Sequence, residues 1–252
     1  MNSNEPRPPL HPIFLDLSGR PVLIAGGGTV GLRKAREFIE CGARLTVVSP
    51  SFHPGFSALE GRFRKVDRNW LPGDEGGNRL VVAATSDHDA NRAIYAICSQ
   101  RGILCNVVDV PDLCDWQAAA VAREGQVQIA VSTAGAAPSL ASFARRELQD
   151  WLSDGFAELV DVVADLRSEL RDAMELADRE RFWKTLPVTE LLELLRREGP
   201  SACGSRIREL ASAAMSEAPD AAPKGRVVLV GAGPGHPDLI TRLGLRILGR
   251  AT

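Results

Sequence analysis

The segment Pro21–Gly31 constrains the fold of this chain more than any other part of the sequence. It joins a short apolar run to three consecutive glycines and then to a helix-like stretch. In such a strand–turn–helix unit Gly26 permits a tight turn, Gly28 lets a pyrophosphate approach the backbone, and Gly31 lets the helix lie close to the strand. Free N–H groups at the helix N-terminus attract the phosphates, so no lysine is required. The segment therefore predicts a dinucleotide-binding unit.

Short apolar runs recur through the first half of the chain, and helix-patterned stretches separate most of them. This alternation predicts a doubly wound parallel sheet of the α/β, Rossmann-like class. The expected strands are Val22–Ala25, Leu45–Val48, Leu80–Ala84, Leu104–Val108 and Val127–Val131, with Arg62–Val66 as a further candidate. The expected crossover helices are Thr29–Cys41, ended by Gly42, and Asp89–Gln100, begun by Asp87 or Asp89 and ended by Gly102.

The second half of the chain has a different character. From Ser139 to Met215 we find no strand-like alternation, and leucine, alanine, arginine and glutamate dominate, which indicates helices. Ser216–Lys224 is typical of a linker. A second strand-and-glycine signal follows at Val227–Gly235, and a helix-like stretch at Leu239–Leu248. One strand and one helix cannot bury their own apolar faces, so we expect this tail to belong to a domain that is missing.

Composition excludes several classes of protein. The 252 residues carry a formal net charge of -2, which argues against a broad nucleic-acid-binding surface. No apolar run approaches the roughly 18 residues that a membrane span needs. The five cysteines show neither a Cys-x-x-Cys pair nor zinc-ligand spacing. These features predict a cytoplasmic protein that binds neither nucleic acid nor membrane.

Ligands of doubly wound sheets lie at the carboxyl ends of the strands, which gives the candidate nucleotide contacts. They are Gly26, Gly28, Thr29, Val30, Gly31, Ser49, Pro50, Ser51, Ala84, Thr85 and Asn106. Many NAD enzymes place Asp or Glu about 20 residues past the glycines to hold the ribose. This chain has Ser49-Pro50-Ser51 there and no arginine that would favour a 2′-phosphate, so NAD is expected rather than NADP. Asn106 is expected between cofactor and substrate.

Asp109 is the candidate catalytic residue. It follows an apolar strand at the carboxyl edge of the expected sheet, where a carboxylate can act as a general base. An aspartate before Val110-Pro111 is equally an ordinary strand-to-turn residue, and the sequence pattern leaves the two readings evenly balanced.

Several segments together resemble the amino-terminal part of siroheme synthase, the precorrin-2 dehydrogenase and sirohydrochlorin ferrochelatase family. The most specific is Asn106-Val107-Val108-Asp109, one strand past Ala84-Thr85. The others are Pro12-Ile13-Phe14, Gly26 to Ala35, Gly42 to Pro50, Leu113 to Trp116 and Ile129 to Pro138. The tail from Val230 to Thr241 looks like the opening of the S-adenosylmethionine-dependent uroporphyrinogen methyltransferase domain.

The resemblance implies NAD-dependent oxidation of precorrin-2 to sirohydrochlorin, then insertion of ferrous iron to give siroheme, with Asp109 as the base. It also implies a homodimer. The expected domains are 1–115 for nucleotide binding, 116–150 for dimerisation, 151–218 as a helical domain, and 219–252 as linker and truncated methyltransferase start. The methyltransferase reaction itself is excluded for so short a segment.

Substrate contacts are expected from residues that follow the sheet domain. Ser132 and Thr133 match a serine-rich loop of the family, and Arg145 and Arg146 are cations suited to a polycarboxylate substrate. A solvated helix face is the plainer interpretation of the two arginines.

The scattered histidines predict no stored metal site. Where many relatives have Phe-x-x-Pro and Gly-Gly, this chain has Trp116 to Ala119 and Ala134-Gly135. Trp116 can replace the aromatic wall, while Ala134 is expected to resist a positive φ. Two alternatives therefore stay open: a dehydrogenase without chelatase activity, and a non-catalytic NAD-binding sensor or remnant of a longer enzyme.

Overall fold

The computed structural model describes residues 9–216, 228–231, 240, 241, 244 and 248. The chain divides into two compact units, 1–157 and 158–252, and each is described by itself. In the described part of the chain, no helix combines the length and apolar character that crossing a membrane requires.

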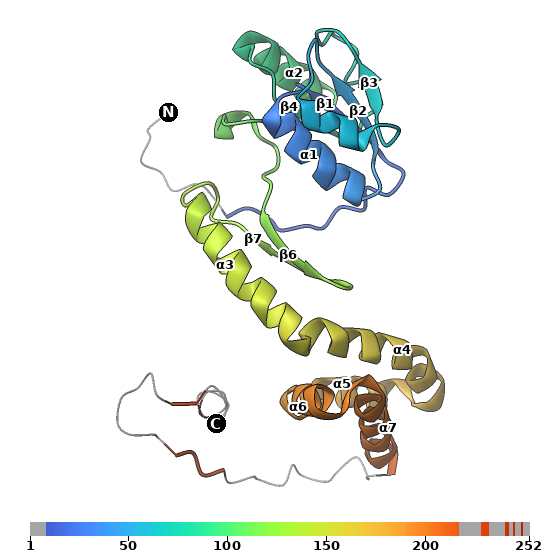
Figure 1. Ribbon diagram of the computed structural model, residues 1–252. Coiled ribbons are helices and arrows are strands. Elements are labelled where there is room, and N and C mark those ends of the chain that lie inside the picture. Colours follow the sequence, from blue (N-terminus) through green and yellow to red (C-terminus); the bar gives the residue numbers. More distant parts are fainter. Residues whose placement is uncertain (1–8, 217–227, 232–239, 242–243, 245–247, 249–252) are drawn as a thin grey trace. The chain divides into compact units, whose positions relative to one another are not determined.

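A five-stranded parallel sheet forms the centre of the first unit (Figure 1). Its strands are β1 (Pro21–Ala25), β2 (Arg44–Val48), β3 (Arg64–Val66), β4 (Leu80–Ala83) and β5 (Leu104–Val107). Their order is β3-β2-β1-β4-β5, and Ala25 at the end of β1 lies opposite Val48 of β2 and Ala83 of β4. The chain order reverses between β1 and β4, which makes their carboxyl ends the switch point of the sheet. The predicted fold class is confirmed.

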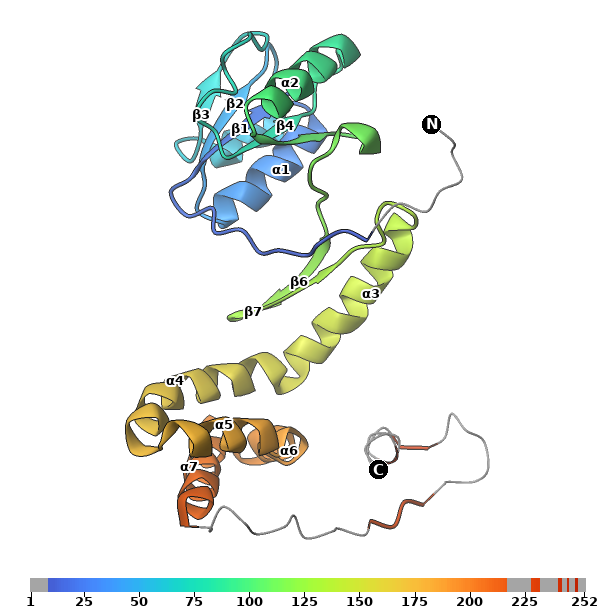
Figure 2. The ribbon, with the colours of Figure 1, turned by 180° about the vertical axis from the view of Figure 1, so that it is seen from behind.

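Two helices cover opposite faces of this sheet, as Figures 1 and 2 show from front and back. Helix α1 (Thr29–Glu40) packs Leu32 and Phe38 into the core on one face. Helix α2 (His88–Gln100) packs Ile94 and Cys98 into the core on the other. Alternate residues of each central strand point to the two cores, so β1 and β4 are buried on both sides.

The first loop after β3 is fixed by a buried carboxylate. Glu75 is fully buried, and both its carboxylate oxygens accept from the Gly73 N–H, at 3.1 and 3.0 Å. Arg101, at the C-cap of α2, donates to the same carboxylate at 2.8 Å. A buried carboxylate needs such a partner, so this pair ties the loop to the end of α2.

Val127–Val131 is a strand, but the prediction that it joins the parallel sheet is wrong. As β7 it pairs antiparallel with β6 (Ala120–Glu124), and the two form a separate two-stranded sheet. Sequence reasoning missed β6 because Arg123 and Glu124 interrupt its apolar pattern. A turn at Gly125, with φ of 52°, joins the strands, and a hairpin so short needs no crossover helix.

Helix α3 (Pro138–Trp151) covers the hairpin. Its Gln149 side chain bonds both backbone groups of Arg123, accepting from the N–H at 3.0 Å and donating to the carbonyl at 2.9 Å. The amide thus acts as a partner for the outer edge of β6. A π-turn at Leu152–Phe156 then redirects the chain, and Gly155 supplies the positive φ of 97° that this kink requires.

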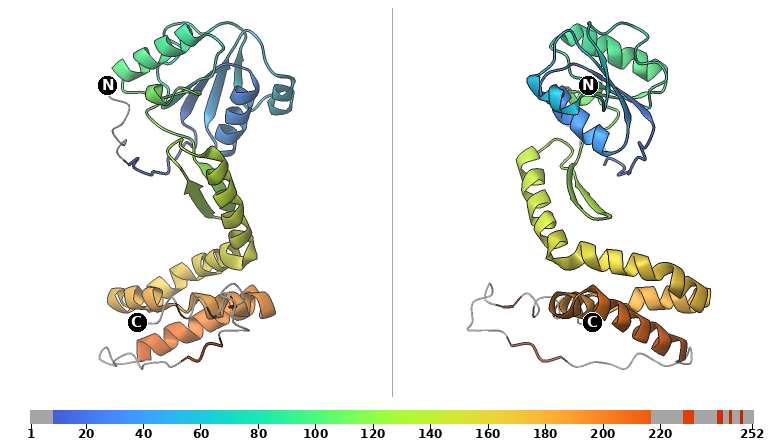
Figure 3. Two further views of the ribbon diagram at one scale, coloured as in Figure 1. Left: turned by 90° about the vertical axis from the view of Figure 1, so that its left-hand side faces the viewer. Right: turned by 45° about the vertical axis from the view of Figure 1, so that its right-hand side comes forward.

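Four helices make up the described core of the second unit, which Figure 3 shows from two further sides. They are α4 (Ala157–Ala173), α5 (Leu176–Thr185), α6 (Val188–Glu198) and α7 (Pro200–Ser216). Leu159, Val162, Leu166 and Leu170 recur at helical spacing and form the buried stripe of α4.

Much of the predicted tail cannot be compared with the structure. The linker after Ser216 lies outside the described residues, as does most of the expected helix at Leu239–Leu248. Residues 228–231, within the second expected strand, are described and have no strand structure.

Candidate active site

A cavity of about 540 Å³ lies at the carboxyl ends of β1, β2, β4 and β5. It is lined by Gly26, Gly27, Gly28, Thr29, Val30, Val48, Ser49, Pro50, Ser51, Asn69, Trp70, Ala84, Thr85, Ser86, Asp87, His88, Asn91, Val108, Asp109 and Val110. The fold therefore brings Asp109 into the same cavity as the glycine loop Gly26–Gly28, although the two are far apart in sequence.

The glycines of this loop have different physical roles. Gly26 has φ of 122°, and a Cβ there would lie 2.2 Å from the Ala84 carbonyl oxygen. A Cβ at Gly31 would lie 2.1 Å from the Gly26 carbonyl oxygen, so Gly31 allows close packing of helix on strand and does not line the cavity. A Cβ at Gly28 would meet nothing within 4 Å. Gly28 is therefore dispensable for packing but leaves the backbone open toward the cavity.

The N-terminus of α1 suits a pyrophosphate. Gly28 is the N-cap, no side chain caps the helix, and the first turn holds no acidic residue. The first intrahelical bond runs from the Leu32 N–H to the Gly28 carbonyl at 2.9 Å. The N–H groups of Thr29, Val30 and Gly31 therefore precede the regular helical bonds, and they are free to donate to an anion.

The Ser49–Ser51 turn differs from its expected role in one respect. Ser49 is buried, and its hydroxyl donates to the Ser51 carbonyl at 2.7 Å. The Ser49 proton is therefore used inside the turn and does not reach a ribose. Ser51 is exposed at the cavity and keeps its hydroxyl available.

Asn91 positions the loop after β4, a role that sequence reasoning missed. The Asn91 Oδ1 accepts from the Thr85 N–H at 3.2 Å and from the Thr85 hydroxyl at 2.7 Å, while its Nδ2 donates to the Thr85 carbonyl at 3.0 Å. Asn91 is buried inside α2. An asparagine one turn inside a helix, opposite a strand end, is the signal that could have identified it.

Asp109 lies in a strained turn. Its φ is 60°, one of two positive values among the described non-glycine residues, and the Val110 N–H donates to the Val107 carbonyl at 3.2 Å across the turn. Positive φ favours glycine, although aspartate tolerates it better than most residues. The carboxylate is exposed at the cavity.

The segment 114–116 holds this turn from the other side. The Cys114 thiol donates to the carbonyls of Val107 and Val110, at 3.2 and 3.3 Å. Burial raises the pKa of the Cys114 thiol, which keeps the thiol protonated as a donor. The Asp115 carboxylate accepts from the Cys105 N–H at 2.9 Å.

Asn106 belongs to this support and does not line the cavity. Its Nδ2 donates to the Trp116 carbonyl at 2.9 Å and contacts the Cys114 sulfur at 3.3 Å. The structure therefore does not bring Asn106 together with the other candidate nucleotide contacts, because its amide holds the neighbouring segment. Trp116 itself packs edge-on against Phe38, with ring centroids 6.2 Å apart.

Ser132 and Thr133 line a different cavity, of about 350 Å³, opposite Arg33 and Lys34 of α1. Both hydroxyls serve the loop: the Ser132 oxygen accepts from the Ala134 N–H at 3.1 Å, and the Thr133 oxygen from the Ala137 N–H at 3.2 Å. Ala134 adopts φ of 50°, contrary to expectation, because these bonds and Gly135 fix the tight loop around it.

Arg145 and Arg146 line neither of these two cavities, and the Arg146 guanidinium lies 6.0 Å from the Phe143 ring centre. The exposed cation of the second cavity is instead Arg33, since Lys34 is buried and ion-paired with Glu37 at 2.6 Å. Among the described residues, no group of three or more His, Cys, Asp or Glu side chains could hold a metal ion.

The sheet order, the glycine loop and the cavity beside them define a dinucleotide-binding protein of the Rossmann class. A family model described as "Putative NAD(P)-binding" matches residues 13–120. A solved structure described as "SirC, precorrin-2 dehydrogenase" shares the fold, with a TM-score of 0.61 and 23% identity, over 82% of this chain and 100% of that one.

Two curated relatives show more specifically which proteins this chain is similar to. The siroheme synthase of Pseudomonas aeruginosa is 35% identical over 95% of this chain and 51% of its own length. That of Methylococcus capsulatus is 39% identical over 95% of this chain and 51% of its own length. In sequence, this chain is therefore similar to siroheme synthases. It spans about half the length of the curated relatives it matches.

Proposed function

We propose that this chain oxidises precorrin-2 to sirohydrochlorin with NAD as the electron acceptor. The observation that carries the proposal is that Asp109 and the open glycine loop line one cavity. NAD, when bound there, supplies a hydride acceptor. The relatives named for this pathway and the matching nucleotide-binding family support the same reading.

The residues of the loop would bind and orient the cofactor. The pyrophosphate would accept from the N–H groups of Thr29 and Val30, and Gly28 would leave room for its approach. Ser51 and the backbone of Pro50 would contact the ribose, while Ala84 and Thr85 border the nucleotide. No arginine or lysine is among the cavity residues, which supports NAD over NADP.

Asp109 would act as the general base. Loss of a hydride from the macrocycle to the nicotinamide leaves one proton to be removed, and the Asp109 carboxylate would accept it. The exposed position of the carboxylate allows contact with a large flat substrate. Arg33 would bind a substrate carboxylate, together with the loop of Ser132 and Thr133 in the neighbouring cavity.

We further propose that ferrous iron is a second substrate, inserted into sirohydrochlorin to give siroheme. Metal insertion displaces two pyrrole protons, and Asp109 would accept them in turn. The protein then needs no resident metal, because the macrocycle nitrogens receive the iron.

The deciding experiment mixes the purified chain with precorrin-2 and NAD and follows NADH and the macrocycle spectrum. Turnover that Asp109→Asn lowers by about a hundredfold or more, with NAD binding unchanged, is expected for a base. NAD binding without turnover would favour the non-catalytic sensor. Turnover with no spectral change after ferrous iron is added would favour a dehydrogenase alone.

The assembly proposed is a homodimer formed through the hairpin and α3. Leu140 and Phe143 of α3 are 64% and 53% exposed, which is unusual for large apolar side chains on one helix face. All five cysteines are free thiols, which supports a reducing cytoplasmic location.

A further inference from the structure

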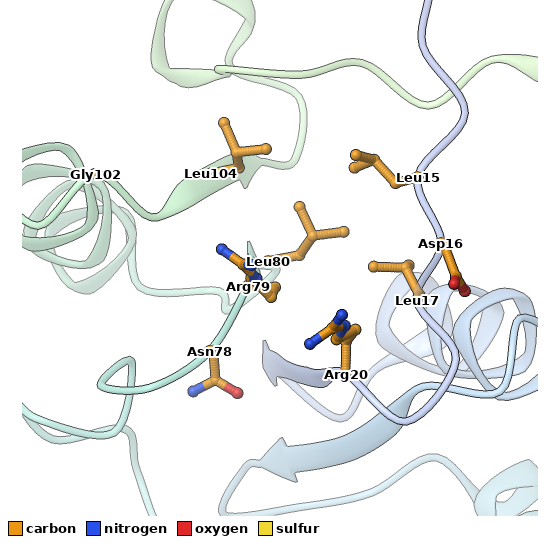
Figure 4. Close-up of a pocket in the computed structure, with 9 residues that line it drawn as sticks. All are labelled: Leu15, Asp16, Leu17, Arg20, Asn78, Arg79, Leu80, Gly102 and Leu104. Atoms are coloured by element: carbon orange, nitrogen blue, oxygen red, sulfur yellow. The ribbon is translucent and has the colours of Figure 1, made fainter.

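A separate hollow lies at the opposite edge of the sheet from the nucleotide cavity. It has a volume of about 490 Å³ and is shown in Figure 4. Its lining residues are Leu15, Asp16, Leu17, Arg20, Asn78, Arg79, Leu80, Gly102 and Leu104. These residues precede or begin β1, β4 and β5, so the hollow lies at the amino ends of the strands. It is therefore separate from the site that contains Asp109.

One wall of the hollow is apolar. Leu15 and Leu17 point from the amino-terminal segment toward Leu80 and Leu104 of the sheet (Figure 4). Leu15 is 47% exposed and Leu104 is 37% exposed, so apolar surface is left open to solvent here. Covering it with an apolar group would be favourable.

Two arginines stand beside this apolar wall. Arg20 and Arg79 also line an adjoining hollow of about 600 Å³, where Arg101 joins them. Arg101 is ion-paired with Glu75, whereas no ion pair of Arg20 or Arg79 is found among the described residues. Asp16, the acidic residue of the lining, accepts from the Ser18 N–H at 2.9 Å, and its carboxylate points away from Leu80 and Leu104 (Figure 4).

We propose that this hollow binds an amphipathic oxyanion. A carboxylate or phosphate would lie between Arg20 and Arg79, and an apolar chain attached to it would cover the leucines. Guanidinium groups suit both kinds of oxyanion, because their planar donors match the acceptor geometry. The proposal does not depend on the redox activity, since the two sites occupy opposite edges of the sheet.

The test is calorimetric titration of the whole chain with octanoate and with octyl phosphate, which separates the two oxyanions. Octanol, which lacks the charge, and inorganic phosphate, which lacks the chain, are the reference compounds. We expect at least one of the two amphiphiles to bind more tightly than either reference. Arg20→Gln and Arg79→Gln should each raise the Kd of the amphiphile that binds by about tenfold. Leu15→Ser should weaken the binding of that amphiphile but not the binding of inorganic phosphate.

A matched control is Arg62→Gln, which removes an exposed arginine elsewhere on the same unit. This variant should bind the amphiphiles like the unmodified chain, and all variants should keep their affinity for NAD. The proposal would be overturned if the double variant Arg20→Gln/Arg79→Gln bound octanoate or octyl phosphate as tightly as the unmodified chain does. It would also be overturned if neither amphiphile bound, or if inorganic phosphate bound as tightly as the amphiphiles.

Discussion

At the scale of single residues, Asp109 has a backbone conformation that suits glycine better than a residue with a side chain. The turn between Val107 and Val110 holds Asp109 at φ of 60°, where glycine would be less strained. A chain selected for stability alone has no reason to keep a carboxylate at this position. The strain is consistent with the role of a base proposed for Asp109.

This strain predicts an order of stabilities. Asp109→Gly should leave the free energy of unfolding within about 1 kcal/mol of the parent, because relief of strain offsets the greater freedom of the unfolded chain. Asp109→Asn should behave similarly, and Asp109→Ala should be less stable by about 1 kcal/mol. Urea unfolding measures the order, and turnover should be lost in all three. An alanine variant as stable as the glycine variant would contradict the argument.

Gly26 is needed for packing, whereas Gly28 is expected to matter for NAD binding alone. Gly26→Ala places a Cβ 2.2 Å from a backbone oxygen, so it should destabilise the chain by several kcal/mol or prevent folding. Gly28→Ala meets nothing within 4 Å, so its melting temperature should match that of the parent. Its Kd for NAD should nevertheless rise about tenfold or more, because the Cβ occupies the path of the pyrophosphate.

Calorimetry and thermal melts check both variants. Unchanged NAD affinity in Gly28→Ala would show that the pyrophosphate does not approach this glycine.

At the scale of elements, β5 and the segment that follows it form the support of the site. Asn106, Cys114 and Asp115 fasten residues 114–116 back onto β5, and the Asp109 turn lies between the two. A sequence pattern shows a strand followed by a proline-containing turn, and it does not show that the next segment folds back on the strand. The isolated bridge between Asn106 and Cys114 is the contact that closes this support.

The Cys114 thiol predicts a pH dependence. Its pKa is raised above the ordinary 9.0 because burial disfavours the thiolate. The unfolded thiol therefore loses its proton at lower pH than the folded one. Stability from this group is present below pH 9 and is lost as the pH rises above it.

The free energy of unfolding, measured in urea at about pH 7.5 and about pH 10, tests this pH dependence, because the unfolded thiol titrates roughly between these two values. At the lower pH, Cys114→Ala should have a free energy of unfolding about 1 kcal/mol below that of the parent, because two carbonyls lose their donor. Between the lower and the higher pH, the free energy of unfolding should fall less in this variant than in the parent. Cys41→Ala, at a half-exposed cysteine away from the turn, is the control. An identical decline in the Cys114 variant and the parent would contradict the assignment.

At the scale of the whole molecule, the hairpin and α3 are too small to be stable by themselves. Two strands and one helix leave Leu140 and Phe143 exposed on the same helix face, one turn apart. A second copy of the chain would cover them, which supports the proposed homodimer.

Leu140→Glu/Phe143→Glu should convert the dimer to a monomer, because burying two carboxylates in an apolar interface is unfavourable. Light scattering during size-exclusion chromatography gives the mass. Leu71→Glu is the matched control, since Leu71 is 54% exposed on a loop of the sheet domain. A monomeric parent chain, or a dimer that survives the double change, would show that α3 is not the interface.

Local signals determined much of this protein. The glycine loop, the buried strands and the capped helices follow from residues that are neighbours in sequence, because propensity, turn chemistry and apolar periodicity act over a few residues. The helical character of 139–215 follows for the same reason. The position of Asp109 at the carboxyl edge follows from the parallel order of the strands.

Tertiary structure alone decided which side chains are free to act. Ser49 and Asn106 have suitable chemistry in the sequence, yet their polar groups are bonded within the protein, to Ser51 in one case and to Trp116 in the other. The sequence shows neither the pairing of β7 with β6 nor the position of Arg20 and Arg79 in the lining of one hollow. Such contacts join residues distant in the chain, and a hydrogen bond depends on positions in space that no local pattern encodes.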